Sequence, residues 1–247
     1  MTSLLYPGNT LSQAVLQEAV WASERVLHIH PLQRAWITLR MDAGFGTDHN
    51  LHWALRQGYQ VVAKNNSGRR AGMWGERVQD WQVIVPDQRW VALSPEPLEF
   101  GVPTRTLAVR WRDHHTHKLK HALYVVTDLH HSLPEVCQMY DLRGGLEVDI
   151  RDDKQGLLLT HRRKRYWYAQ ETLVLLNDLA HNLLSMFRRV VLADTPLAQW
   201  GPYRLIRDVL AIPGEAIIAD DQLVELRLAQ SHPLSAILVE VLPRLWQ

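Results

Sequence analysis

The sequence predicts an α/β protein in which a mostly antiparallel β segment is followed by a helical C-terminal part. Residues 11–63 alternate twice between an amphipathic helical pattern and a short apolar strand pattern. Four strand-like stretches follow between residues 65 and 128, separated by clusters of Pro, Gly, Asp and His. From about residue 133, apolar residues return mainly at helical spacing. The alternation is typical of an α/β layer, and consecutive strands joined by short turns favour antiparallel pairing.

The first part of the chain predicts two helices and two strands. Residues 11–27 have apolar side chains at helical spacing, so they predict an amphipathic helix. Residues 35–41 are short, apolar and partly β-branched, and predict a strand that ends at Asp42. A second helix is expected from Thr47 to about residue 57, and a second strand over residues 59–63.

Residues 65–128 predict strands without an intervening helix, at 81–85, 90–93, 106–111 and 119–127. A helical region is expected over residues 133–155, followed by a long helix over 166–191. The remainder predicts a helix near residues 203–210, a hairpin turning at Asp220 and Asp221, and a final helix after Pro233.

Composition limits the classes of protein to consider. Of 247 residues, 47% are hydrophobic and 21% charged, which is ordinary for a globular protein. No apolar run approaches the ~20 residues of a membrane span, and the N-terminus has no signal-peptide pattern. The single cysteine, Cys137, excludes an intramolecular disulfide and a cysteine-rich zinc module. We therefore expect a cytoplasmic protein with no membrane partner.

Basic residues gather in local patches, although the formal net charge is only +1. Any binding of nucleic acid must therefore rest on the patches and not on a general cationic field. A solvated surface would show the same runs. The patches are Lys64 with Arg69 and Arg70, Lys118 with Lys120, residues 162–165, and Arg188 with Arg189.

Four side chains of different chemistry recur at helical spacing. Tyr140, Arg143, Glu147 and Lys154 are separated by three, four and seven residues, which return to one helix face at about 100° per residue. A carboxylate between cations suits phosphoryl transfer, because it can hold a divalent metal while the cations position phosphates. The glycines at 144–145 weaken a helix, so the helix can begin or bend there. A charged amphipathic helix with chance spacing is the alternative.

A second segment of interest, from Arg40 to Gly46, follows the first predicted strand and contains Asp42. A dinucleotide-binding turn at Gly44-x-Gly46 is a competing interpretation. It lacks the third glycine, and it would set the Asp42 carboxylate near a pyrophosphate.

On these residues the chain resembles a known family. Tyr140, Arg143, Glu147 and Lys154 match the YREK signature of a large group of bacterial insertion-sequence transposases with DDE chemistry. The Asp42 segment is similar to the one that carries the family's second catalytic Asp. The similarity covers most of residues 1 to about 210 and includes Tyr6-Pro7-Gly8-Asn9-Thr10, Ser67-Gly68-Arg69-Arg70-Ala71, Asp153-Lys154-Gln155-Gly156-Leu157 and Ala180-His181-Asn182-Leu183-Leu184.

The resemblance implies an RNase H-like catalytic core, interrupted by a β insertion between the second Asp and the Glu. The strands expected over residues 65–128 fit that insertion. The implied organisation is an incomplete core over 1–64, the insertion over 65–128, the rest of the core with the YREK helix over 129–195, and a C-terminal region over 196–247.

The resemblance also implies roles for individual residues. Asp42 and Glu147 would hold Mg²⁺, so their Cα atoms should lie within about 12 Å of each other. Tyr140, Arg143 and Lys154 would contact DNA near the cleaved phosphate. The implied partners are the DNA of the element ends and of the target, and a second copy of the chain on paired ends. Arg162 and Arg163, in the basic run at 161–165, would contact phosphates or form a solvated face.

One departure from the family stands out, because its first catalytic Asp lies on an earlier strand and residues 1–41 contain no Asp. We therefore expect a truncated copy that does not cleave DNA by itself. The alternative function is a non-catalytic DNA-binding or assembly-inhibiting fragment. An unrelated α/β metal-dependent nuclease remains a third reading if the YREK spacing arose by chance.

Three weaker features have simpler interpretations. The histidines at 114, 115, 117, 121, 130 and 131 match no known zinc spacing and are expected in solvated loops. Asp128 ends a strand; it could lie near the site, but a turn or cap role is preferred. The tryptophans of the β segment could stack on bases, although most tryptophans are core residues.

Overall fold

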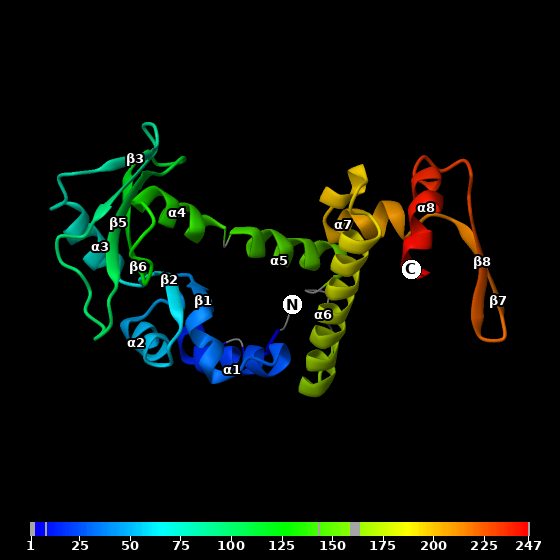
Figure 1. The fold of residues 1–247 in the computed structure, drawn as a ribbon, viewed down its shortest axis with the longest axis horizontal. Helices are drawn as coiled ribbons and strands as arrows, with labels where there is room; N and C mark the ends of the chain where they lie inside the picture. Colours follow the sequence, from blue (N-terminus) through cyan, green and yellow to red (C-terminus); the bar gives the residue numbers. More distant parts are fainter. Residues whose placement is uncertain (1–2, 8, 143, 159–163, 247) are drawn as a thin grey trace. The chain divides into compact units, whose positions relative to one another are not determined.

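A computed structural model describes residues 3–7, 9–142, 144–158 and 164–246 of the chain (Figure 1). The chain divides into two compact units. The sheet unit is Tyr6–Gly144, and the helical unit is Met1–Leu5 together with Gly145–Gln247. Each unit has its own core, so each is described separately. No helix among the described residues has the length and apolar character that crossing a membrane requires.

The sheet unit is built on six strands in the order β1-β2-β6-β5-β4-β3. Only the pair β1 and β2 is parallel, and the other neighbours are antiparallel. The mostly antiparallel character predicted for residues 65–128 is therefore confirmed. The strands are β1 (Thr38–Met41), β2 (Gln60–Lys64), β3 (Gln82–Val85), β4 (Arg89–Leu93), β5 (Arg105–Arg112) and β6 (Leu119–Val126).

Helices cover both faces of this sheet, because successive strand residues point to opposite sides. Val61 packs with residues of α1 (Leu16–Leu27) and α2 (Asp48–Arg56), whereas Val62 packs with α4 (Leu133–Asp141). Both valines are fully buried, and each such side chain contributes about 1.5–3 kcal/mol by leaving water. The sheet therefore lies between two apolar layers.

Two segments of the sheet unit differ from the prediction. The expectation of no helix between 65 and 128 is wrong, because α3 (Gly68–Gly75) lies there. Its three glycines disfavour a helix, but the Ser67 side chain caps the helix and buried Trp74 packs it against the sheet. The first two residues of the strand expected at 35–41 belong instead to a 3₁₀ helix, Pro31–Trp36, which His30 caps.

The helical unit contains α5 (Gly144–Gly156), the long α6 (Trp167–Val190), α7 (Pro202–Arg204) continuing as a π-helical turn (Leu205–Val209), and α8 (Ser235–Val241). Buried leucines from α6 and the later elements form its core. The predicted hairpin is confirmed as β7 (Gly214–Ala219) and β8 (Gln222–Leu228), with positive φ at Asp220 and Asp221. The long helix and the final helix are confirmed as well. Short 3₁₀ helices occur at Ser12–Ala14, Pro196–Gln199 and Leu242–Trp246.

The proposed division at residues 64, 128 and 195 stays a prediction. Strands from both sides of the first boundary pair in one sheet, since Val62 of β2 lies opposite Val126 of β6.

Candidate functional site

Asp42 lies at the carboxyl end of β1, in a turn closed by its own atoms. Its Oδ1 accepts hydrogen bonds from the amides of Gly44 (2.9 Å) and Phe45 (3.2 Å). Its backbone carbonyl accepts one from the amide of Gly46 (2.8 Å). A side chain that accepts from amides two and three residues later forms an Asx turn. The half-buried carboxylate is therefore fixed at the strand end by local sequence.

This turn is docked against the end of β2. A Cβ at Gly46 would overlap the Lys64 carbonyl, so only glycine fits this close approach. The buried side chain of Asn65 donates from Nδ2 to the Gly46 carbonyl (3.3 Å) and to Asp48 (2.7 Å). The glycine predicted as part of the Asp42 segment therefore serves packing between strands, and the dinucleotide reading gains no support from it.

The second acid of this region, Asp48, is bound to Arg70. Arg70 Nη2 lies 2.8 Å from Oδ2 of Asp48. Burial raises the pKa of Asp48, but hydrogen bonds from Arg70 and Asn65 outweigh it and hold the pKa below its usual value. Asp48 is therefore a structural acid that ties α3 to the start of α2.

The strand register brings Tyr140 near the same edge of the sheet. Met41 lies opposite Ala63, and Ala63 lies opposite Val125. With strands spaced about 4.8 Å apart, the backbones of Asp42 and Tyr124 should lie about 10 Å apart. The rings of Tyr124 and Tyr140 stack with centroids 4.3 Å apart. The described part of the sheet unit thus places Asp42, Tyr140 and Lys64 in one region.

The expected single stripe of Tyr140, Arg143, Glu147 and Lys154 on one helix is wrong. The chain leaves α4 at Asp141 and begins α5 at Gly144, at the predicted pair of glycines, so Tyr140 and Lys154 lie on different helices. Lys154 is exposed, and the backbone of residue 147 lies in α5. Arg143, Arg162, Arg163 and the side chain of Glu147 lie outside the described residues.

A strand-end Asp, a helix that carries cations and an α/β sheet are features of enzymes that bind and cut DNA. The comparison with known families shows to which family the chain belongs. A model of the family described as Transposase DDE domain group 1 matches residues 4–247. The chain belongs to this family of transposase DDE domains. No curated protein matches it. The family belongs to a class of enzymes that cleave and transfer DNA, and DDE domains generally use divalent metal ions.

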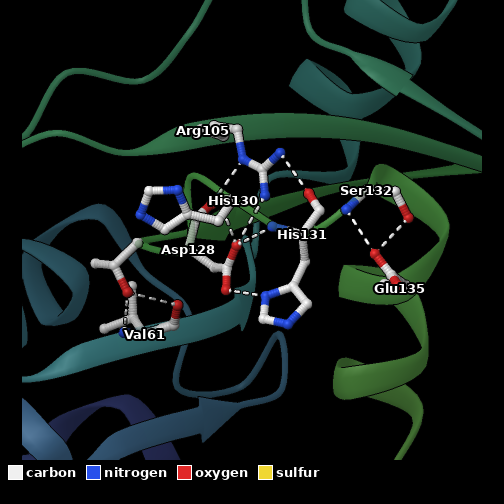
Figure 2. A network of polar contacts seen from close by, with 8 residues as sticks. Val61, Arg105, Asp128, His130, His131, Ser132 and Glu135 are labelled. Atoms are coloured by element: carbon white, nitrogen blue, oxygen red, sulfur yellow. Dashed lines mark hydrogen bonds and ion pairs between the residues drawn. The ribbon is translucent and has the colours of Figure 1, made fainter.

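In this DDE domain, Asp128 does not lie beside Asp42. The strand β6 runs antiparallel to β2, so Asp128 lies four residues beyond the position level with Asp42, about 13 Å along the strand. Its Oδ1 accepts from the amides of His130 (2.9 Å) and His131 (2.8 Å), and Arg105 binds it from the neighbouring strand (Figure 2). The preferred turn role is confirmed, and a role at the Asp42 site is wrong.

The surroundings of Asp128 also explain its low pKa. Burial raises the pKa of Asp128, but hydrogen bonds from the backbone and ring of His131 and from the His130 amide lower the pKa to about 2. Figure 2 shows these donors converging on the carboxylate from the loop between β6 and α4. These hydrogen bonds therefore fix the conformation of that loop.

Sequence reasoning missed a basic hollow on the α4 face of the sheet. Its volume is about 290 Å³. Lys64 lies over the Trp111 ring, with Nζ 5.3 Å from the centroid, and Arg89 donates to the Tyr124 hydroxyl (3.2 Å). Alternation of cations and aromatics on β4 and β5 was the available signal. The lining residues are Lys64, Val85, Gln88, Arg89, Trp111, Arg112, His114 and Tyr124.

The metal ligands expected for the DDE domain fall in separate units, Asp42 in the sheet unit and Glu147 in the helical unit. Their predicted Cα distance therefore stays a prediction. Carboxylate oxygens are the donors that a hard divalent cation prefers, so the chemistry of this pair fits such an ion. Within the described ranges, no group of three His, Cys, Asp or Glu side chains is placed to hold a metal.

Proposed function

We propose that this chain is a DDE-type DNA transposase that binds the ends of an insertion sequence and cuts and joins its strands. The observation that carries the proposal is the family match over residues 4–247. The hydrogen-bonded Asp42 at a strand end and the exposed Lys154 support it. It acts in the cytoplasm, and a second copy on paired DNA ends is the expected assembly.

Asp42 and Glu147 are the proposed metal ligands. Both supply carboxylate oxygens, which suit Mg²⁺. When bound, Mg²⁺ would lower the pKa of a coordinated water and neutralise charge at the phosphate. The Asx turn holds the Asp42 carboxylate at the end of β1 before any ion arrives, which reduces the reorganisation that binding requires.

Cations and aromatics are the proposed DNA contacts. Lys154 is exposed and free to meet a backbone phosphate, and Arg143, Arg162 and Arg163 supply further charge. The basic hollow adds Arg89 and Arg112 on the sheet unit. These local groups can attract DNA although the net charge is only +1.

A metal-dependent protein cleavage experiment tests the ligand pair without DNA. Fe²⁺ replacing Mg²⁺ reduces added hydrogen peroxide to hydroxide and hydroxyl radicals, which cut the backbone close to the ion, and ascorbate returns the Fe³⁺ to Fe²⁺. We expect fragments that end near residue 42 and near residue 147, with both sets lost in Asp42→Asn. The control variant is Asp48→Asn, which removes a nearby acid that binds Arg70. Fragments from only one of the two regions would remove the other residue from the site.

A second candidate function is a non-catalytic DNA-binding or assembly-inhibiting protein. One observation favours it, which is that residues 1–41 contain no Asp. A DDE site needs three carboxylates, because two metal ions must be both neutralised and fixed against the phosphate.

One assay separates the two candidates. The purified chain is incubated with Mg²⁺ and DNA that carries the ends of the element flanking its gene. Binding without strand cleavage would support the second candidate, because loss of a metal ligand should cost more than the ~10²-fold of a 1 Å misplacement. Cleavage that disappears in Glu147→Ala would instead establish the enzyme. A chain that neither binds nor cleaves this DNA would contradict both functions.

A further inference from the structure

Among the described residues, a buried polar pair links the helix α5 to α6 of the helical unit. Asp153 on α5 is only 3% exposed, and its Oδ1 lies 2.7 Å from Nδ1 of His181 on α6. Figure 1 shows α5 ending against the long α6. We infer that this pair is a positioning device that fixes the rotation of α5 and so sets the direction in which Lys154 projects.

The neighbours of Asp153 show which side of α5 is docked. Gly156 lies so close to Tyr203 that a Cβ would meet its backbone at 2.7 Å, and Asp152 lies against Gly201. At about 100° per residue, Gly156 is about 60° and Asp152 about 100° to one side of Asp153. Leu157, which joins the apolar core, is about 40° to the other side. These four positions define one docked side of the helix.

The functional positions fall on the remaining side. Lys154 lies about 100° and Glu147 about 120° from Asp153, so they share a direction to within about 20°. Lys154 is exposed, as is Arg151 at about 160°. A rotation of α5 about its axis by one residue, about 100°, would carry Lys154 to the docked side. The direction of Lys154, and the helix face on which position 147 lies, therefore depend on what holds Asp153.

The polar pair gives this docking its specificity. Apolar contacts are tolerant of direction, so they do not by themselves fix one rotation of α5. A buried carboxylate without a partner is costly, so Asp153 has one orientation in which it is satisfied. On α5, the resemblance to the family assigns roles to Glu147 and Lys154, and it assigns none to Asp153 or to His181 of α6.

A distance measurement tests the inference without DNA. Spin labels are placed at Lys154→Cys and at Met186→Cys, an exposed position on α6. The native Cys137 is fully buried, so the introduced thiols react selectively. We expect a narrow distance distribution in the otherwise native chain and a broad or shifted one in His181→Leu. An unchanged distribution would overturn the inference.

Two conservative variants separate positioning from general stability. Asn at position 181 can donate from about the place of Nδ1, whereas Gln places its amide about one bond further out. We therefore expect His181→Asn to keep the native distribution and His181→Gln to lose it. These two folded variants decide the question even where His181→Leu does not fold. Equal behaviour of Asn and Gln would overturn the inference.

A DNA-binding cycle adds a functional readout, and this part rests on the proposed function. With a labelled duplex of arbitrary sequence, Lys154→Ala should lower the slope of log affinity against log salt by about 0.9. In the His181→Gln background the same substitution should change the slope by less than half of that. Fully additive effects would contradict positioning.

The matched control is Ser3→Ala. The Ser3 hydroxyl donates a hydrogen bond (2.8 Å) to Asp178, a second buried acid, which lies on α6. We expect this variant to leave both the distance distribution and the effect of Lys154→Ala unchanged. A native chain that does not bind DNA would contradict the proposed function alone, because the spin-label distances still decide the positioning.

Discussion

In the sheet unit, Asp42 is held by amides of its own turn, which packs on the backbone of the adjacent strand, whereas in the helical unit the polar contact of α5 joins it to a helix distant in sequence. The first support is encoded within a few residues of Asp42. The second joins residues 153 and 181, which are remote in sequence. Local support should resist substitution elsewhere in the chain, and remote support should depend on a single partner.

The largest expected effect is on the local support. Gly46→Ala introduces a methyl group that meets the backbone of Lys64, so strand or turn must move. We expect a loss of about 1–3 kcal/mol in the free energy of unfolding, measured by urea denaturation. The control is Gly72→Ala in α3, where a Cβ meets nothing within 4 Å and where alanine should add about 0.5–1 kcal/mol. Equal effects of the two variants would remove the close approach as the reason for Gly46.

A slightly smaller effect is expected where the turn meets β2. Asn65→Ala deletes the two donations to the Gly46 carbonyl and to Asp48 and leaves these groups partly unsatisfied. The expected loss is about 1–2 kcal/mol in the free energy of unfolding. Asn66→Ala is the matched control, because the Asn66 side chain is exposed. A loss of stability in Asn65→Ala but not in Asn66→Ala would support the conclusion that local hydrogen bonds hold Asp42.

A weaker effect is expected from the helical unit, on binding instead of stability. Lys154→Ala should lower DNA affinity several-fold and reduce the salt slope by about one phosphate contact. Arg143→Ala should do the same. Lys118→Ala, which removes an exposed cation of the sheet unit, serves as the control. Titrating salt with each variant measures the slopes, and identical slopes would deny Lys154 its phosphate role.

The smallest effect concerns acid stability. Because hydrogen bonds hold the pKa of Asp128 at about 2 in the folded chain, against about 3.9 when unfolded, its contribution is present above pH 4. It is lost as the pH falls from about 4 toward 2. Urea midpoints of native chain and Asp128→Asn should therefore converge over that interval. A difference between them that stays constant down to pH 2 would refute the assigned network.

Sequence reasoning worked best where local chemistry dominates. The Asp42 segment, the helix beginning after Thr47 and the hairpin at Asp220 and Asp221 follow from turn and cap residues within short windows. The resemblance to DDE transposases is confirmed by the family match, whereas the YREK signature stays a prediction.

It failed where tertiary contacts override local preference. The glycine-rich α3 exists because Trp74 and Ala71 are buried against β5 and β6, which no propensity predicts. In the sequence, Asp153 and His181 are two ordinary polar residues of the segments that carry the resemblance. Nothing in the sequence indicates that they pair. Arg89 and Arg112 were missed because a cation at a strand end looks like any solvated charge until the strands are paired.

The buried position of Cys137 on α4 has a consequence for the chemistry of the whole protein. Burial raises the pKa of its thiol to about 12, and only a thiolate reacts readily with oxidants or disulfides. Since Cys137 is the single cysteine of the chain, copies of the folded protein have no thiolate with which to cross-link. Oxidising conditions should therefore produce no disulfide-linked dimer for as long as α4 stays packed on the sheet.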